Sequence, residues 1–538
     1  MFNNESQLSS YGFGQRSRLS MKYLNLDSEL SQIQFPDSYK TIFDPIHGHI
    51  TFSKIMWDII DTPQFQRLRN LRQLSTSHFI YHGNNHTRFE HCLGTGFLSK
   101  DLINRCFDIV SNKNQDNTKI DRNEIDYLKK CVSIAGLCHD IGHGPFSHSF
   151  ELILKNLGIN DWDHEEFGGR IIQNLIDENN IDFIDEDDLK MINSLIDGSN
   201  LRKTEYNWIY QIVANKENSI DVDKFDYIQR DIYHSGVKTL SVDYTRIFKD
   251  INIINDKICF SSKTDMSLFS LFQARYCLHH KIYNHPSTIC VESMVKDALI
   301  LSKDFFKFEE CILDPAKFIK LDDNILDTIL TFSLNSDEEI SNNKKFLEAE
   351  KIIKRVYERD FYSIIGEIPI PIGKNEEPKL DEFLCNENPK DEYYLSENDI
   401  ELRKKEINFG FKDKNPFETI YFYEPKQPDD YFKKPMEHFI IMPQVFSEST
   451  ILVFCKDKKK NERAKKLFNI YKDKLQKKWN IMESPEREKI DLDEKNFFYD
   501  ETEEKNLRTP KFGKGSYTKK RKRDDKIENF DYSNSGEK

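Results

Sequence analysis

One short stretch constrains the fold and chemistry of this 538-residue chain more than any other. It runs from Gly136 to His148 and holds three histidines and one aspartate within ten positions. Apolar residues recur with helical periodicity from Ile125 to Cys138, which places the stretch at the end of an apolar helix. His139 and His143, four residues apart, are therefore predicted to share a helical face, with Asp140 beside them. Imidazole and carboxylate groups gathered in this way indicate a metal site.

The same stretch also predicts an anion site beside the metal. Gly142 and the Gly144-Pro145 pair are expected to end the helix, and proline suits the first turn of the helix that follows. The N-terminal amides and the positive dipole end of that second helix would face the same pocket and attract phosphate. Metal and anion are therefore expected to meet here.

The adjacent His-Asp pair has candidate partners on both sides in the sequence. His91 lies upstream and Asp223 lies downstream. The order His, His-Asp, Asp supplies two imidazoles and two carboxylates, which suits iron, manganese or zinc and does not suggest a thiolate site. An ordinary, partly buried histidine at a helix break would explain one such residue but not the whole set. The pattern is similar to the one that names the HD phosphohydrolases.

Composition narrows the class of protein. A formal net charge of −13 excludes a chain that is basic throughout, so any nucleic-acid contact would be local. The ten cysteines include no C-x-x-C pair and are expected to be reduced packing residues of an intracellular protein. No apolar run approaches the ~20 residues of a membrane span, and the first residues lack a signal-peptide core. We expect a soluble protein without a membrane partner.

The chain is predicted to be mainly α-helical. We expect a disordered tail at residues 1–36, an HD-domain helical core at 37–357, a smaller α+β lobe at 358–481 and a disordered charged tail at 482–538. The last tail contains the basic run Lys519 to Arg523, which is typical of nuclear import signals and also of solvated tails. The protein is therefore expected in the nucleus, the cytoplasm or both.

Helical patterns carry most of the polar candidates. The Thr62-Pro63 pair predicts the start of a helix whose outer face is basic, through Arg67, Arg69 and Arg72. Another helix is expected from Asp163 to Asp177. After Asp223 the polar residues form one stripe, which is either a pocket wall or a solvated face: Asp223, Lys224, Tyr227 and Asp231. A strand pair is expected within 251–261, helices at 267–283 and 288–305, and strands near 419–423, 438–442 and 451–454.

Together these motifs resemble a known family. Over roughly Ser38 to Asn480, the chain is similar to the SAM-and-HD-domain deoxynucleoside triphosphate triphosphohydrolases, with the densest matches at 44–50, 61–69, 88–91, 135–148 and 220–224. The resemblance implies hydrolysis of a deoxynucleoside triphosphate (dNTP) to a deoxynucleoside and intact triphosphate, and hence control of dNTP pools. No SAM domain is expected before the HD region.

The resemblance also implies roles for individual residues. The implied metal ligands are His91, His139, Asp140 and Asp223, with Mg²⁺ accompanying the nucleotide. The implied catalytic acid is His164, which Glu151 would orient in place of the family's aspartate. The implied substrate contacts are Gln73, Leu74, Arg88, His143, His148, Lys224, Tyr227, Asp231, Arg275, Tyr283 and Asn284. Among these, Gln73 and Asp231 would hold the sugar 3′-hydroxyl, and Tyr283 would crowd a 2′-hydroxyl.

Regulation is implied as well. Lys40, Asp61, Gln66 and Arg69 match the family's guanine-nucleotide activator site, so GTP or dGTP is expected to activate a homo-oligomer, which is a tetramer in the family. The Asp61 carboxylate could accept both the N1 and the N2 protons of guanine, although capping of the helix at Pro63 would also explain it. The family has a second activator site, in which Ser261 replaces an arginine while Lys263 is retained. The identity of any second activator nucleotide is therefore left open.

Two alternative functions remain open from the sequence. An HD phosphodiesterase or 5′-nucleotidase would need the same metal but fewer cations than Arg88, Lys224 and Arg275 provide. A protein that binds single-stranded nucleic acid would use the basic helix face and the basic tail, with a vestigial HD site. The complete ligand set and the three cations favour the triphosphohydrolase.

Overall fold

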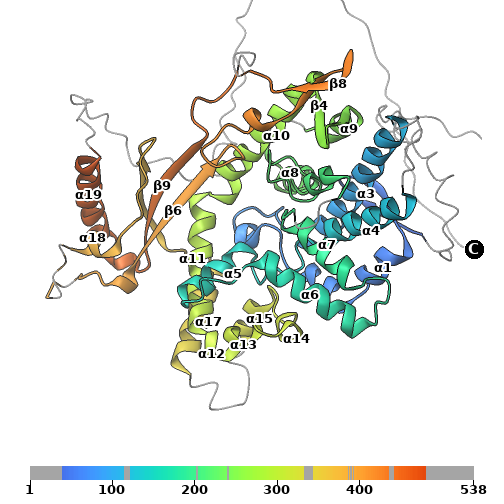
Figure 1. Ribbon diagram of the computed structural model, residues 1–538. Helices are drawn as coiled ribbons and strands as arrows, with labels where there is room; N and C mark the ends of the chain where they lie inside the picture. Colours follow the sequence, from blue (N-terminus) through green and yellow to red (C-terminus); the bar gives the residue numbers. More distant parts are fainter. Residues whose placement is uncertain are drawn as a thin grey trace, which may run out of the picture. The chain divides into compact units, whose positions relative to one another are not determined.

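The computed structural model describes residues 39–113, 121–200, 204–238, 242–331, 343–385, 387, 390–391, 393–435 and 441–479 (Figure 1). Both predicted tails, including the run Lys519 to Arg523, lie outside these residues. Helices dominate the described part of the chain, which confirms the mainly α-helical class. None of its helices combines the length and the apolar character that a bilayer span requires.

The helices that position the site lie in the first half of the chain. α3 (Arg88–Lys113) packs along α4 (Arg122–Cys138) and against α8 (Val222–Ser235), which in turn contacts α10 (Asp265–Leu278). Gly94 permits the close approach of α3 to α8, because a Cβ atom at this position would lie 1.8 Å from Asp226 Oδ1. The side chains of α3 are buried on more than one face, so this helix forms the centre of the core.

The other helices surround this group. Before α3 come α1 (Lys54–Ile60), α2 (Pro63–Gln66) and the 3₁₀ helices η2 (Arg67–Asn70) and η3 (Ser75–Phe79). After α4 come α5 (His148–Asn156), α6 (His164–Asn179), α7 (Glu186–Ile196), η4 (Asn207–Gln211) and α9 (Tyr244–Lys249). The later helices are the π-helical turn η6 (His279–Tyr283), α11 (Pro286–Leu301), α12 (Lys303–Phe306), α13 (Phe308–Cys311), α14 (Pro315–Phe318), α15 (Ile325–Thr331) and α17 (Lys344–Tyr357).

In the described part of the chain, three small antiparallel or mixed sheets accompany the helices. β1 (Lys40–Asp44) and β2 (Gly48–Phe52) form a hairpin. The predicted strand pair at 251–261 is confirmed as β3 (Ile251–Ile254) and β4 (Lys257–Ser261), and β4 continues the sheet to β7 (Phe422–Glu424) and β8 (Gln427–Phe432). The third sheet has the order β5-β9-β6, formed by β5 (Ser363–Ile370), β9 (Ser447–Cys455) and β6 (Ile400–Asn408).

The region after α17 mixes strands and helices. Figure 1 shows α18 (Leu380–Leu384) and α19 (Asn461–Lys478) near β6 and β9, and α19 contacts both β5 and β9. These elements enclose a second, smaller apolar cluster that includes Ile451, Val453 and Leu467. However, Phe417 and Phe422 belong to the main core cluster, and β7 pairs with β4. A domain boundary at residue 357 therefore remains a prediction.

The predicted helix after Pro63 is shorter than expected. Thr62 caps it, since its hydroxyl accepts the Phe65 N–H, but α2 ends at Gln66 and continues only as the 3₁₀ turn η2. The chain then straightens because Arg72 pairs with Thr87 in an antiparallel bridge. Arg67 does not lie on an outer basic face: it is buried and donates to the carbonyl oxygens of Leu321 and His143.

Two expectations about the stretch from Gly136 to His148 are wrong. Helix α4 ends at Cys138, so His139 and His143 do not share a helical face. Pro145 lies in a turn and does not open the next helix, because α5 begins only at His148. The loop between the two helices packs closely against α6: a Cβ at Gly142 would lie 2.0 Å from the His164 carbonyl oxygen, so a side chain does not fit there.

The predicted strands near the C-terminal region are also only partly correct. Residues 419–423 contain the end of a 3₁₀ turn and only the first residues of β7. The described residues of the 438–442 segment, Ile441 and Met442, belong to no strand, and Pro443 follows them without an N–H to donate. The segment at 451–454 lies within β9, where its side chains are buried. The ten cysteines are free, and eight of them are buried packing residues, whereas Cys277 is half-buried and Cys385 is exposed.

Candidate metal centre and catalytic pocket

Three helix ends bring the predicted metal ligands together. His91 lies in the first turn of α3, His139 directly follows α4, and Asp223 lies in the first turn of α8. His91 Nε2 is 3.1 Å from His139 Nε2 and 3.1 Å from Asp223 Oδ1. His139 Nε2 is 3.5 Å from the same Asp223 oxygen. The ligand atoms of these residues therefore converge on one point.

The hydrogen bonds of the His91 and His139 imidazoles show which ring nitrogens are available to a metal. His91 Nδ1 donates to Asp226 Oδ2 at 2.7 Å, and His139 Nδ1 donates to the Gly136 carbonyl at 2.9 Å. Both Nε2 atoms are then left with lone pairs that face each other, an arrangement that a cation between them stabilises. Two metal–nitrogen bonds of about 2.1 Å at a right angle place the two nitrogens about 3.0 Å apart. The distance between His91 Nε2 and His139 Nε2 is 3.1 Å, close to that value. The residues fit a divalent metal.

The electrostatics of the cluster favour positive charge at the same point. Burial would lower the pKa of His91, but its contacts with Asp223 and Asp226 raise it to about 10. Burial would likewise raise the pKa of Asp223, but the His139 and His91 imidazoles lower it. A site that stabilises a proton between these groups also stabilises a divalent cation, since both supply positive charge there.

Asp140, the fourth predicted ligand, lies at the edge of the cluster. Its carboxylate oxygens are 3.4 Å from His91 Nε2 and 3.5 Å from His139 Nε2. Asp140 also forms a short ion pair with the Arg88 guanidinium, whose Nε donates to Ser147 Oγ at 2.8 Å. Burial would raise the pKa of Asp140, but Arg88 and His139 hold it well below its usual range. The carboxylate is therefore ionised and available to a cation.

Asp226 is a functional residue that the sequence analysis missed. Besides His91, it accepts hydrogen bonds from His47 Nε2 at 2.6 Å and from two guanidinium nitrogens of Arg230. Arg230 also donates to Asp44 Oδ2 at 3.0 Å. Burial would raise the pKa of Asp226, but Arg230 keeps it well below its usual range. The one signal in the sequence was its position three residues after Asp223, on the same helix.

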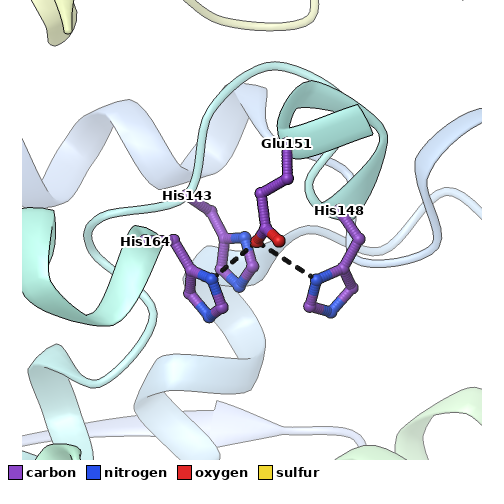
Figure 2. A group of neighbouring side chains, drawn as sticks. All are labelled: His143, His148, Glu151 and His164. Atoms are coloured by element: carbon purple, nitrogen blue, oxygen red, sulfur yellow. Dashed lines mark hydrogen bonds and ion pairs between the residues drawn. The ribbon is translucent and has the colours of Figure 1, made fainter. Parts of the chain in front are cut away.

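The predicted acid, His164, and its orienting carboxylate, Glu151, lie together (Figure 2). His164 Nδ1 is 2.7 Å from Glu151 Oε1, so the longer side chain of glutamate still reaches the histidine. Burial would lower the pKa of His164, but the hydrogen bond to Glu151 raises it. Asp163 caps α6 through the amides of Glu165 and Glu166 and so fixes the backbone at His164. A histidine held in its protonated form is suited to donate a proton.

Two further histidines complete this group. The His143 ring stacks on His164 with centroids 3.9 Å apart, and His148 Nδ1 is 3.6 Å from Glu151 Oε1. The His143 and His164 rings are inclined by only 21°, so their in-plane lone pairs run side by side and do not meet at one ion. The group shown in Figure 2 is therefore better arranged for proton transfer than for a second metal.

His143 connects this group to the metal cluster. Its Nε2 lies 3.3 Å from Asp140 Oδ1. Burial, together with Arg88, holds the pKa of His143 well below its ordinary value, so the ring is neutral and can donate one hydrogen bond to Asp140. Through this residue the acid pair and the metal cluster form one continuous site.

Three of the predicted phosphate contacts, Lys224, Tyr227 and Arg275, come from α8 and α10. Lys224 Nζ lies 3.1 Å from Asp221 Oδ2, and Arg275 donates to the Asn408 carbonyl at 2.8 Å. Arg275 is close enough to act electrostatically on both Lys224 and Tyr227. Burial would lower the pKa of Lys224, but Asp221 raises it, so Lys224 remains cationic. The stripe on α8 is therefore a partly buried wall and not a solvated face.

The predicted sugar contacts form a second group. The Tyr283 hydroxyl donates a short hydrogen bond to Asp231 Oδ2. Gln73 presents a buried Oε1 atom without a hydrogen-bond partner among the described residues. Leu74 packs against the core, and Asn284 Nδ2 lies 3.5 Å from His279 Nδ1. The structure thus pairs Asp231 with Tyr283, and among the described residues no hydrogen bond joins the Gln73 side chain to either.

The four predicted activator residues form two pairs. Lys40 Nζ lies 3.2 Å from Asp61 Oδ2, and both side chains are more than half exposed. Arg69 Nε donates to Gln66 Oε1 at 2.7 Å, and Gln66 donates to the Ile60 carbonyl. Thr62, not Asp61, supplies the side chain that caps α2, so capping does not account for Asp61.

A helical core whose helix ends present His, His-Asp and Asp defines an HD-domain metal-binding protein, and residues 88–231 match the HD domain family. The chain is 36% identical over 453 residues to the deoxynucleoside triphosphate triphosphohydrolase SAMHD1 homolog of Dictyostelium discoideum, covering 83% of this chain and 82% of the relative. It is 34% identical to SAMHD1 of Gallus gallus over 79% of this chain and 73% of the relative. For SAMHD1 of Homo sapiens the identity is 31%, over 86% and 78%. The chain belongs to the SAMHD1 family of deoxynucleoside triphosphate triphosphohydrolases.

Proposed function

We propose that this protein hydrolyses dNTPs to a deoxynucleoside and inorganic triphosphate. Family membership supports the reaction class. The observation that carries the proposal for this chain is the continuity of the site. Asp140 joins the His91, His139 and Asp223 cluster to His143, whose ring stacks on the paired acid His164. One substrate phosphate can therefore reach the metal cluster and the proton donor at the same time.

The chain's own residues account for the remaining steps. A bound divalent metal would lower the pKa of a coordinated water and polarise a phosphoryl oxygen. Arg88, Lys224 and Arg275 would neutralise the three linked phosphates and the charge that develops on them. As water adds to the α-phosphorus, the bond to the 5′ oxygen breaks, and His164 would supply the proton that this oxygen needs. Triphosphate then leaves intact.

The ligand types narrow the choice of metal to three elements. Two imidazoles and two carboxylates suit iron, manganese or zinc at the HD site. Mg²⁺ prefers phosphate and carboxylate oxygens, so we propose that it enters with the nucleotide. Metal analysis of the protein as purified would distinguish these ions.

We further propose that GTP or dGTP activates the enzyme through Lys40, Asp61, Gln66 and Arg69, and that activation is coupled to assembly of a homotetramer. The Lys40 and Asp61 side chains are exposed beside each other, as groups that bind a ligand at a subunit contact need to be. Import through Lys519 to Arg523 would place such an enzyme in the nucleus, where it would control dNTP pools.

The test is incubation of the purified protein with each dNTP, with and without GTP, followed by separation of the phosphate products. We expect triphosphate and a deoxynucleoside, and much slower hydrolysis of ATP than of dATP because Tyr283 is held against Asp231. The matched control is the double variant His139→Ala, Asp140→Ala, which should lose metal and turnover. Release of monophosphate or orthophosphate would favour the phosphodiesterase or nucleotidase alternative. Salt-sensitive retention of single-stranded nucleic acid without nucleotide turnover would favour the binding protein.

A further inference from the structure

His86 lies where two segments of the chain pair beside the site. Residues 71–73 and 86–88 run antiparallel, with a bridge between Arg72 and Thr87. The Gln73 N–H donates to the His86 carbonyl at 3.0 Å, and the Arg88 N–H donates to the Leu71 carbonyl at 2.8 Å. The backbone of His86 therefore sets the position of Gln73, whose buried Oε1 atom has no hydrogen-bond partner among the described residues.

The imidazole of His86 contacts Asp231. Its Nε2 lies 2.7 Å from Asp231 Oδ1, and the two side chains are 0% and 1% exposed. The Tyr283 hydroxyl donates to the other carboxylate oxygen, Oδ2. Each oxygen of a carboxylate can accept about two hydrogen bonds. Both oxygens of Asp231 are therefore held in place, and each retains capacity to accept a hydrogen bond from a ligand.

Packing holds the His86 ring in one orientation. His234 stacks on it, with ring centroids 4.4 Å apart and an interplanar angle of 14°. The backbone of His234 is in turn close to the loop before His86, since a Cβ at Gly83 would lie 2.0 Å from the His234 carbonyl oxygen. A ring fixed on one face by stacking and at one edge by a carboxylate loses little further freedom when a ligand binds.

We propose that His86 is a positioning residue for recognition of the sugar, and that the preference for a ligand with a 3′-hydroxyl depends on it. Its imidazole orients the Asp231 carboxylate, which can accept the proton of the hydroxyl, and its carbonyl orients Gln73, whose amide can bond to the hydroxyl oxygen. One residue thus places two partners for the same hydroxyl. The proposal rests on the proposed dNTP substrate. His86 itself does not touch the reacting phosphate; it acts through Asp231 and Gln73.

The experiment compares dATP with 2′,3′-dideoxyATP, which lacks the 3′-hydroxyl. His86→Leu removes the donor to Asp231, so kcat/KM for dATP should fall by about 10-fold to 100-fold, the usual value of a hydrogen bond to a charged group. The kcat/KM for 2′,3′-dideoxyATP should not change. His86→Gln, whose amide can still donate to Asp231, should retain most of the preference for dATP.

His82→Leu is the matched control, because it makes the same substitution at an exposed residue of the same loop and should leave both nucleotides unaffected. Metal content and melting temperature report whether each variant folds. If His86→Leu does not fold, His86→Asn replaces it, since its side chain is polar but too short to reach the carboxylate. An equal loss of kcat/KM for dATP and for dideoxyATP in His86→Leu would overturn the proposal and leave His86 a purely structural residue.

Equilibrium binding separates this inference from the proposed function. Affinities for dATP and dideoxyATP are measured with Ca²⁺ in place of the catalytic metals, so that turnover does not interfere. A wild-type preference for dATP that disappears in His86→Leu would support the role of His86 even if no triphosphate were ever released. Equal affinity of the wild-type protein for the two nucleotides would overturn it. Failure of the proposed function alone would appear as tight, selective binding without hydrolysis.

Discussion

Asp226 accepts a hydrogen bond from Nδ1 of His91 at 2.7 Å, while Nε2 of the same ring faces the metal cluster. The carboxylate thereby selects the tautomer that presents a lone pair to a metal and holds the ring in the plane that ligation requires. Arg230 and His47 hold Asp226 in turn. The metal site is therefore supported by a buried network that extends to Asp44 at the end of β1.

Replacement of Asp226 by Asn is predicted to weaken metal binding. The amide removes the negative charge that His91 and Arg230 share, and loss of such a supporting carboxylate typically costs about 10-fold to 100-fold in metal affinity. Metal content after dialysis against graded chelator is the measurement. Asp108→Asn, an exposed aspartate on α3, is the control and should keep its metal. Unchanged metal retention in Asp226→Asn would show that the network is not needed for ligation.

Replacement of Glu151 by Gln is predicted to shift the pH dependence of turnover. His164 must be protonated to act as an acid, and the hydrogen bond to Glu151 raises its pKa. Without the carboxylate this pKa falls, so the decline of kcat on the alkaline side should begin at lower pH. The measurement is the pH profile of kcat for both proteins. Glu151→Asp, which keeps the charge, serves as the control. An alkaline limb that stays in place would mean that His164 is not the acid.

Replacement of Asp61 by Ala is predicted to abolish GTP stimulation while the metal is retained. Its carboxylate is the group proposed to accept the guanine N1 and N2 protons, a pair of donors that adenine does not offer. Hydrolysis of dATP is followed with rising GTP, with light scattering as a measure of assembly. Asp58→Ala, which removes another carboxylate from α1, is the control. A wild-type protein that is fully active as a monomer without guanine nucleotide would defeat this prediction.

Asp323 is predicted to make the stability of the protein depend on pH. Its carboxylate accepts the N–H of Phe146 at 2.7 Å and the N–H of Arg72 at 2.9 Å, which ties down a turn in which Phe146 and Ser147 both have positive φ. Burial raises the pKa of Asp323 to about 6. Because an unfolded aspartate titrates near 3.9, the folded protein binds more protons between these values.

The free energy of unfolding should therefore contain a component that declines as the pH rises from about 4 to about 6. Asp323→Asn lacks that component, so its stability deficit relative to the wild type should shrink as the pH rises through this window. Denaturant titrations at several pH values provide the measurement. Asp322→Asn is the control, because this half-buried neighbour accepts the Asn70 side-chain amide and the Asn324 N–H but bonds to neither Phe146 nor Arg72 among the hydrogen bonds of the described residues. A deficit that is constant with pH would contradict the prediction.

Local sequence patterns predicted helices and strands correctly where neighbouring residues determine where these elements begin and end. The strand pair within 251–261 and the start of a helix at Asp163 each follow from turn, capping or periodicity signals within a few residues. Periodicity failed after Cys138 and after Gln66. After Cys138 the chain packs closely against α6 at Gly142, and after Gln66 it goes on to pair with residues 86–88 through the bridge between Arg72 and Thr87.

The sequence by itself determined the chemistry of the site. Residue types in the order His, His-Asp, Asp specify nitrogen and oxygen ligands for a metal, whatever the fold around them. Only the tertiary structure decided which groups support them. Asp226 meets His91 across 135 positions of the chain, and His86 meets Asp231 across 145. Such contacts depend on how α3, α8 and the loop before α3 pack together, which periodicity and motif spacing do not encode because each describes only one element at a time.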